Sequence, residues 1–429
     1  MAFDTPARIA IVGAGPIGLE AALYARFLGY DVDIYEQGAI CQHVRRWQNV
    51  ALFTPFGMNC STLGLAALAA QDPDYRPMRN DQIITGREWI EQYLLPLSQT
   101  DLIADHVHAK TKVVAIGRQN LLKTEAVGSE ERNERGFRIL VQTDGKDENK
   151  EADIVIDASG VLSQPNWIGG DGAPAVGEVS TLLSNAGLPP ERRFWHTDFP
   201  VGIDQSARFA NKSILVLGSG HSAATTISQL AELARIHAGT KVTWVTRHST
   251  SIGPPIRPIE NDQLALRVKL AAAVNQHAAS GADWLRHVGG TCVESIEFNE
   301  SQNKCRVRFA GESNEEVAFD QIFAHVGHRP NLVIFRELQV HLDCVTERPV
   351  QLTTELASAS TEDLVAAHSA ESLLTTEPNF YVLGAKSYGR NSSFLYSDGL
   401  KQIRQLFAVI VDRAELDLYT TSRNLLPKS

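Results

Sequence analysis

Residues 8–22 of the chain are Arg8-Ile-Ala-Ile-Val-Gly-Ala-Gly-Pro-Ile-Gly-Leu-Glu-Ala-Ala22, and residues 30–36 are Tyr30-Asp-Val-Asp-Ile-Tyr-Glu36. The apolar run before the glycines predicts a buried parallel strand, and the residues after them predict a helix. Gly13 allows the tight turn, Gly15 lets backbone approach a pyrophosphate, and Gly18 lets the helix pack on its strand. Glu36 ends a second strand at the distance where a carboxylate accepts hydrogen bonds from ribose hydroxyls. We therefore predict a dinucleotide site with its phosphates at the helix N-terminus.

The composition is that of a globular protein, with 429 residues of which 43% are hydrophobic and 21% are charged. A net charge of -10 and a pI near 5.7 argue against a nucleic-acid partner, because such proteins usually display a basic face. The sequence contains no apolar run of about 18 residues, so we expect neither a membrane span nor a signal peptide. Five scattered cysteines without a CxxC pair are typical of reduced thiols. We expect a soluble, cytoplasmic protein without a metal site.

The strand, glycine turn and helix pattern occurs again at Ser213-Ile-Leu-Val-Leu-Gly-Ser-Gly-His-Ser-Ala-Ala-Thr-Thr226, with Ala223 at the third small position. Two such turns imply two nucleotides. The strand that follows, Lys241-Val-Thr-Trp-Val-Thr-Arg-His248, has no acid where the first unit has Glu36. Because an arginine can pair with a 2′-phosphate that a carboxylate would repel, Arg247 favours NADPH over NADH. The alternative is that Arg247 only solvates a strand end.

Residues 37–70 leave the first unit as a loop, and its part Gln42-His-Val-Arg-Arg-Trp-Gln-Asn-Val-Ala-Leu-Phe-Thr-Pro-Phe-Gly-Met-Asn59 is rich in groups that contact ligands. Its arginines, Trp47 and Thr54 could contact the phosphates and ring of a flavin. The alternative is an ordinary surface connection with Trp47 as a packing anchor. Residues 252–285 likewise either line a substrate site or form a lid without chemistry.

Several later segments complete the predicted sheets. Val107–Ile116 and Phe137–Thr143 predict antiparallel strands, with a mobile polar loop at residues 129–136. The strand at residues 151–157 ends in Ala158-Ser159-Gly160 and a similar strand runs into Gly327, so both turns are expected near a cofactor unless they are plain strand ends. A last strand ends at Gly384 and a helix begins near Asp398, where its N-terminus could stabilise an electron-rich flavin pyrimidine.

With its two glycine turns, the Ala158-Ser159-Gly160 turn and the C-terminal strand and helix, the chain resembles two-dinucleotide-domain flavoproteins of the glutathione-reductase-like class. Within that class it is most similar to flavin-containing and Baeyer–Villiger-type monooxygenases. That similarity rests on Arg46 to Pro55, on His196-Thr197 and on Gly218 to Ala223. In those enzymes NADPH reduces FAD, oxygen adds as a C4a-hydroperoxyflavin, and one oxygen atom goes to a nitrogen, sulfur or ketone substrate. The usual Gly-Asp of their C-terminal strand is Gly384-Ala385 here.

The resemblance implies an α/β fold with two Rossmann-like dinucleotide-binding domains. The FAD-binding domain takes residues 1–200 and 321–429, and an inserted NAD(P)H-binding domain takes residues 205–320. The implied cofactors are FAD and NADPH, and the implied partners are a small-molecule substrate and O2, with a homo-oligomer possible. Candidates for orienting nicotinamide, flavin or substrate are His196, Tyr388 and Arg390. The cofactor-binding candidates are Gly13, Gly15, Pro16, Gly18, Glu36, Gln37, Arg46, Trp47, Thr54, Ser159, Gly160, Gly218, Ser219, Gly220, Ser222, Ala223, Arg247, His248, Gly384 and Asp398.

Two alternatives stay open on sequence alone. The first is a flavoprotein reductase that passes electrons to a disulfide, quinone or protein acceptor without inserting oxygen. A thiol-based version needs a cysteine pair or one low-pKa cysteine beside the flavin, and Cys41 is close enough to Glu36 in sequence to be considered. Alternatively, Cys41 is an unreactive thiol. The second alternative is a redox-sensing protein that holds both cofactors with negligible turnover.

Overall fold

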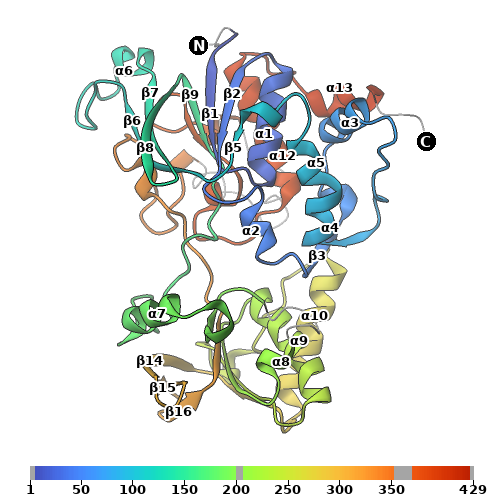
Figure 1. Cartoon of the computed structure of the whole chain (residues 1–429), viewed down its shortest axis with the longest axis vertical. Coiled ribbons are helices and arrows are strands. Elements are labelled where there is room, and N and C mark those ends of the chain that lie inside the picture. The colour runs from blue at the N-terminus through green and yellow to red at the C-terminus, as the bar shows by residue number, and fades with distance from the viewer. Residues whose placement is uncertain (1–4, 200–205, 352–369, 426–429) are drawn as a thin grey trace. The chain divides into compact units, whose positions relative to one another are not determined.

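The structure, a computed structural model, describes residues 5–199, 206–351 and 370–425. It divides into two compact units, unit 1 from residues 1–164 and 329–429 and unit 2 from residues 165–328. Each unit contains a five-stranded parallel sheet and a separate three-stranded antiparallel sheet, which Figure 1 shows with helices around them. The predicted α/β fold, with one Rossmann-like unit inserted into another, is confirmed.

The parallel sheet of unit 1 has the strand order β18-β9-β1-β2-β5. Alternate residues of β1 face opposite layers, so Ile9 and Ile11 pack with helices while Ala10 and Val12 pack with the antiparallel sheet. The strands are β1 (Arg8–Val12), β2 (Asp31–Tyr35), β3 (Ala51–Pro55), β4 (Ile83–Thr85), β5 (Val107–His108), β6 (Thr111–Arg118), β7 (Phe137–Thr143), β8 (Lys146–Ala152), β9 (Ile154–Asp157) and β18 (Phe380–Val382).

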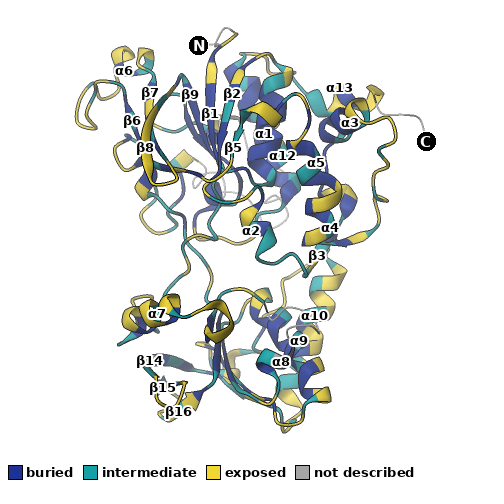
Figure 2. Cartoon of the chain, in the orientation of Figure 1, coloured by how far each residue is buried: buried dark blue, intermediate teal, exposed yellow. Residues whose placement is uncertain are grey.

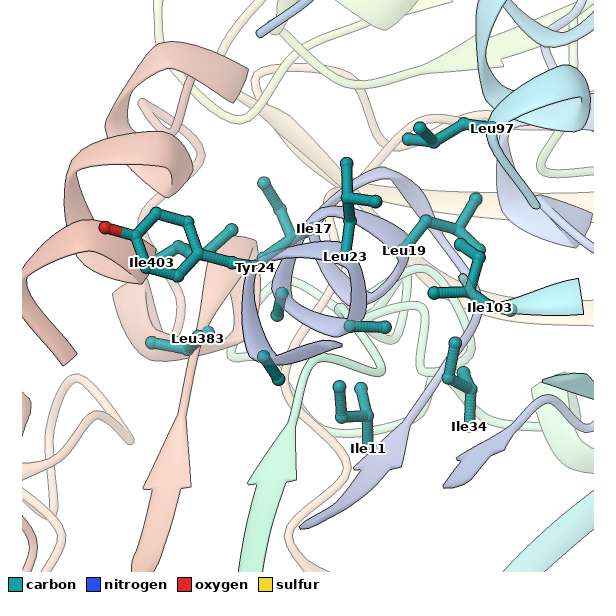
Figure 3. Packing of buried hydrophobic residues seen from close by; sticks show 14 of the residues in the cluster. Ile11, Ile17, Leu19, Leu23, Tyr24, Ile34, Leu97, Ile103, Leu383 and Ile403 are labelled. Atoms are coloured by element: carbon teal, nitrogen blue, oxygen red, sulfur yellow. The ribbon is translucent and has the colours of Figure 1, made fainter. Parts of the chain in front are cut away.

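Helix α1 (Pro16–Phe27) is the centre of the helical layer, with nine of its residues buried. In Figure 3, Leu19 and Leu23 of this helix lie among Ile34, Leu97 and Ile103, and Ile17 and Tyr24 lie toward Ile403. This apolar packing fixes the start of α1, and with it the glycine turn, against β1. The other helices of the unit are α2 (Gln42–Arg45), α3 (Thr62–Gln71), α4 (Gly86–Trp89), α5 (Leu95–Ser98), α6 (Glu130–Glu134), α12 (Tyr396–Ile410) and α13 (Leu418–Ser422).

Unit 2 repeats this architecture, with the parallel order β10-β17-β11-β12-β13 and the antiparallel sheet β14-β15-β16. Strand β11 and helix α9 take the places of β1 and α1. The strands are β10 (Trp195–His196), β11 (Ser213–Leu217), β12 (Lys241–Val245), β13 (Leu285–Val288), β14 (Thr291–Asn299), β15 (Lys304–Gly311), β16 (Glu316–Phe319) and β17 (Gln321–Ala324). The helices are α7 (Glu178–Gly187), α8 (Ser206–Phe209), α9 (His221–Ile236) and α10 (Ala265–Ala279).

In both units the parallel sheet is buried on its two faces, as the dark blue strands in Figure 2 show. The units differ in where the chain supplies the first strand of these two orders, the edge strand next to β9 in unit 1 and next to β17 in unit 2. In unit 1 this strand is β18, which comes late in the chain, whereas in unit 2 it is β10, which comes before the glycine turn. The repeat makes positions in one unit directly comparable with positions in the other.

Four local predictions are corrected by the structure. Residues 107–116 do not form one strand, because Lys110 has a left-handed φ of +56° between β5, in the parallel sheet, and β6, in the antiparallel sheet. Residues 129–136 are not an open loop but contain α6, because Arg132 is buried against Glu377. Residues 37–70 contain α2, β3 and α3. Residues 165–199 belong to unit 2, where Phe194 and Trp195 enter its apolar core.

The predicted boundary at residues 200–205 lies outside the described residues. Within the described ranges, no helix is both long and apolar enough to cross a membrane. In the same part of the chain, no group of three or more His, Cys, Asp or Glu side chains is arranged to hold a metal ion.

Candidate functional site

The glycine turn of unit 1 has the shape that a bound pyrophosphate needs. Gly13 has φ +100°, and a Cβ there would lie 3.0 Å from the Ala158 carbonyl oxygen. A Cβ on Gly18 would lie 1.9 Å from the Gly13 carbonyl oxygen, so this position accepts only glycine. A Cβ on Gly15 would meet nothing within 4 Å, so the chain itself does not fill the space beside this residue. Gly15 is the N-cap of α1, Pro16 follows at the helix start, and no side chain caps the helix.

Glu36 lies at this turn, as predicted, and its carboxylate is already partly engaged. The oxygens accept hydrogen bonds from the Ala14 N–H at 3.0 Å and the Gly38 N–H at 2.8 Å. Desolvation by burial raises the pKa of this carboxyl, and the two backbone hydrogen bonds oppose that shift. Each oxygen keeps a second acceptor direction for a ribose hydroxyl. Gln37, which comes next, is exposed.

A buried ion pair beside the turn was missed by the sequence analysis. The Lys386 Nζ lies 2.6 Å from the Asp157 Oδ2 and donates to the Ser159 Oγ at 3.1 Å, and both charged side chains are fully buried. Asp157 Oδ1 also accepts from the Ser159 N–H and hydroxyl. Ser159 in turn has its Cα against Gly13, so the ion pair fixes the wall of the turn. One sequence feature could have pointed to this pair. Ala385 stands where the similar monooxygenases have an aspartate, and Lys386 follows it directly.

The start of α12 lies at the same edge of the sheet. Gly384 has φ +73°, and its N–H donates to the Gln402 side chain at 2.9 Å. Asp398 accepts from the Leu395 N–H at 3.0 Å, so its carboxylate caps the helix. A Cβ on Gly399 would lie 2.2 Å from Ile17, which shows how closely α12 packs on α1. The structure therefore brings two helix N-termini together beside the glycine turn, where anionic groups of a cofactor are stabilised.

The loop candidates Arg46, Trp47 and Thr54 divide into two groups. Arg46 donates to the Leu162 carbonyl at 2.7 Å, which connects it to the segment after Gly160. Trp47 packs against Gly86, where a Cβ would lie 2.8 Å from its ring, and Thr54 accepts from Asn59 at 2.8 Å. The contacts of Trp47 are those of a packing anchor, the second of its two interpretations, while cofactor contacts of all three residues stay predictions.

The second glycine turn reproduces the first. Gly218 has φ +119°, and a Cβ there would lie 2.1 Å from the His325 carbonyl oxygen. A Cβ on Gly220 would meet nothing within 4 Å, and Gly220 caps α9 without a side-chain cap. Ala223 is fully buried, whereas Ser222 is exposed and Ser219 is half-buried.

Thr246, not Arg247, takes the place of Glu36. Glu36 and Thr246 each follow the second strand directly, and their N–H groups donate at 3.0 Å to His108 and Val288 respectively. Arg247 and His248 come next and are both exposed. The two units therefore differ in charge at equivalent places, with a carboxylate in unit 1 and a neutral hydroxyl followed by basic side chains in unit 2.

The three residues predicted to orient the reacting groups belong to two units, His196 to unit 2 and Tyr388 and Arg390 to unit 1. His196 lies inside unit 2, with its Nε2 2.7 Å from Gln321 and its ring against Phe323. Desolvation lowers the pKa of His196 to about 4. Arg390 makes an exposed ion pair with Glu347 at 2.9 Å, and Tyr388 is buried with its ring edge against Phe394. The orienting roles of these three side chains stay predictions.

The cysteines form no disulfide in the structure. All five are free: Cys41, Cys60, Cys292, Cys305 and Cys344. Cys41 is the one beside the first turn, with its Sγ 3.6 Å from the Ala14 carbonyl oxygen. Desolvation by burial raises the pKa of its thiol to about 12, so it is protonated at neutral pH and a poor nucleophile.

Comparison with known proteins adds the fold relatives. No protein-family model and no curated protein sequence matches the chain. The bacillithiol disulfide reductase of Bacillus cereus superposes with a TM-score of 0.67 at 16% identity, over 95% of this chain and 100% of that one. The ornithine N-hydroxylase of Kutzneria sp. 744 gives 0.59 at 14%, over 95% and 99%. A thioredoxin reductase of T. acidophilum gives 0.55 at 16%, over 95% and 99%.

The chain shares its fold with these enzymes. The solved structures that are similar to it include both disulfide reductases and a hydroxylase, so the fold is common to both chemistries. The hydroxylase structure is that of a complex with reduced FAD, NADP+ and L-ornithine. Both glycine turns of the present chain fit such dinucleotides, because Gly15 and Gly220 leave open space beside an uncapped helix start.

Proposed function

We propose that this chain is an FAD-dependent NAD(P)H oxidoreductase that passes electrons to a small acceptor without inserting oxygen. The observation that carries the two-coenzyme part of the proposal is the repeated glycine turn, with the carboxylate of Glu36 beside it in unit 1 and the neutral Thr246 followed by Arg247 and His248 in unit 2. A carboxylate suits the ribose of FAD, and a basic pair suits the 2′-phosphate of NADPH. Disulfide reductases among the structural relatives support the reductase over the monooxygenase.

Each group of residues has a stated part in this proposal. FAD would supply two-electron transfer from the nicotinamide to the acceptor. Gly13, Gly15 and Gly18 would bind its pyrophosphate through backbone N–H groups, with Glu36 on the ribose. The Lys386–Asp157 pair holds the wall of the turn rigid. Gly218 and Gly220 would bind the pyrophosphate of NADPH.

The acceptor is best supported as a small molecule that reacts with the flavin directly. A relay through a cysteine pair is disfavoured, because the sequence has no CxxC and because Cys41 and Cys60 are buried with raised pKa values. A quinone or a low-molecular-weight disulfide needs no such relay. This favours direct reduction at the flavin.

A monooxygenase is the second candidate, favoured by the likeness to the ornithine N-hydroxylase over nearly the whole chain. It shares the cofactors and differs in the fate of the reduced flavin. The same experiment therefore decides between the two.

The experiment is anaerobic stopped-flow reduction by NADPH or NADH, followed by mixing with a quinone, with glutathione disulfide or with O2. We expect fast reduction by NADPH and reoxidation by an acceptor that outcompetes O2. A long-lived oxygen adduct, with stoichiometric oxygenation of an amine, sulfide or ketone, would establish the monooxygenase instead.

Arg247→Ala tests the coenzyme half of the proposal. A charge-assisted hydrogen bond of about 1.5–3 kcal/mol predicts a rise of about 10- to 100-fold in the KM for NADPH, with the KM for NADH unchanged. Equal effects on both coenzymes would refute the role of Arg247.

A further inference from the structure

Strand β13 carries a histidine, His287, that contacts Thr246 in the loop of residues 246–248 after β12. The His287 Nε2 lies 3.0 Å from the Thr246 Oγ1, and the Thr246 hydroxyl donates to the His248 carbonyl at 3.2 Å. With the hydroxyl proton given to that carbonyl, the His287 tautomer that carries its proton on Nε2 would donate the first bond. The two bonds connect β13 to the residues that follow β12.

The backbone around this point is held equally firmly. The Thr246 N–H donates to Val288 at 3.0 Å, the Thr291 N–H donates to Thr246 at 3.1 Å, and the Gly290 N–H donates to His248 at 2.9 Å. Residues 246–248 are therefore fixed by the segment at 287–291, while the side chains of Arg247 and His248 remain exposed. Such a loop holds the backbone of Arg247 and His248 in one place, from which both side chains extend into solvent.

The same network reaches the glycine turn. Trp244 is fully buried, its Nε1 donates to the Gly218 carbonyl at 2.8 Å, and its ring packs edge-on against His287 at 4.9 Å. His287 thus contacts one residue fixed to the pyrophosphate turn and one fixed to the basic loop. These contacts add to the backbone hydrogen bond that joins the two parts directly, from the Gly218 N–H to the Val245 carbonyl at 3.1 Å.

Unit 1 provides an internal comparison. There the Glu36 side chain accepts from the N–H two residues ahead, at Gly38, whereas in unit 2 the Thr246 side chain donates to the carbonyl two residues ahead, at His248. The equivalent contact has the opposite polarity. It replaces a charge that would repel a 2′-phosphate with a neutral group, and it needs the His287 donor to complete the hydroxyl's bonds.

We propose that His287, acting through Thr246, is a positioning residue that sets the preference of unit 2 for a 2′-phosphorylated coenzyme. The inference rests on the proposed function, since it takes unit 2 as the NADPH site. His287 does not touch the coenzyme in this scheme. It holds the backbone of residues 246–248, and so the positions from which Arg247 and His248 would reach a phosphate group.

The test is calorimetric binding of 2′,5′-ADP and of 5′-AMP to the purified holoprotein, which does not depend on turnover. In wild type we expect 2′,5′-ADP to bind more tightly than 5′-AMP. His287→Phe keeps a ring against Trp244 but removes the donor, and Thr246→Val removes the hydroxyl at constant shape. Because each variant removes about one hydrogen bond, we expect each to lower the ratio of the affinity for 2′,5′-ADP to that for 5′-AMP about five-fold.

Three further variants make the test specific. The double variant should be no worse than either single one, because both remove the same contact, and His287→Gln should restore part of the preference. His277→Phe is the matched control, since His277 also packs edge-on against a tryptophan, Trp284 at 5.5 Å, away from Thr246. It should leave the ratio unchanged.

The outcomes separate the inference from the function it rests on. If wild type binds neither nucleotide, or binds both equally, unit 2 is not the proposed NADPH site and the inference falls with it. If wild type prefers 2′,5′-ADP but His287→Phe and Thr246→Val keep that preference, the positioning role is overturned and the proposed function stands. A loss in His277→Phe equal to that in His287→Phe would also overturn it.

Discussion

The buried ion pair between Lys386 and Asp157 gives the most quantitative prediction. Both side chains are fully excluded from solvent and their charged atoms are 2.6 Å apart. Lys386→Met would leave the Asp157 carboxylate buried with only its Ser159 hydrogen bonds. Removing one partner of a buried pair costs about 3–5 kcal/mol, and because Ser159 stays we expect a loss near the lower end, about 3 kcal/mol.

The double variant Lys386→Met with Asp157→Asn should recover part of this loss, because no unpaired charge remains. Lys150→Met is the control, since Lys150 pairs with Glu148 at 2.5 Å on the surface, where the Glu148 side chain is 64% exposed. An exposed pair contributes about 0–1 kcal/mol. The free energy of unfolding would be measured by urea titration, followed by tryptophan fluorescence and circular dichroism.

The cofactor should report the same change independently. Because Ser159 abuts Gly13, loosening the pair should also weaken FAD binding, measured by flavin release on dilution. If Lys386→Met were no less stable than Lys150→Met, or if the double variant were less stable than Lys386→Met alone, the reasoning from an uncompensated buried charge would be refuted.

Three other predictions follow from single positions. Gly18→Ala should destabilise unit 1 by about 1–3 kcal/mol through overpacking, because its Cβ would lie 1.9 Å from backbone. Gly15→Ala should unfold like wild type in urea yet bind FAD more weakly. Equal stability of the two variants would contradict this reasoning. Cys41→Ser should keep the rate of flavin reduction within about two-fold, since burial raises the pKa of the Cys41 thiol to about 12, and a thiol titration in which native Cys41 reacts at pH 7 would argue otherwise. Burial lowers the pKa of His196 to about 4, so as pH falls this histidine is protonated in the unfolded chain before it is protonated in the folded one. The free energy of unfolding should therefore fall as pH drops from about 6.5 to 4. Urea titrations across that range should give a smaller dependence of this free energy on pH for His196→Phe, and an unchanged dependence would refute the lowered pKa.

The amino-acid sequence by itself determined the α/β fold and the two glycine turns. These features are local, because a buried apolar run, glycines at fixed spacing and a following helix all lie within about 20 residues. Gly13, Gly15 and Gly18 could be assigned separate tasks from spacing alone, and the structure gives each of them the surroundings those tasks need.

Only the tertiary structure decided which distant residues meet. Lys386 and Asp157 are 229 positions apart, and Arg132 meets Glu377 across 245, so no local pattern could reveal either pair. The second pair also explains why residues 129–136 contain a helix, α6, where their polar composition predicted a loop. Thr246 and His287 come together because β12 and β13 are neighbours in the sheet. The side chains that lie beside each glycine turn are determined by packing at the carboxyl edge of the sheet. That packing depends on the whole chain.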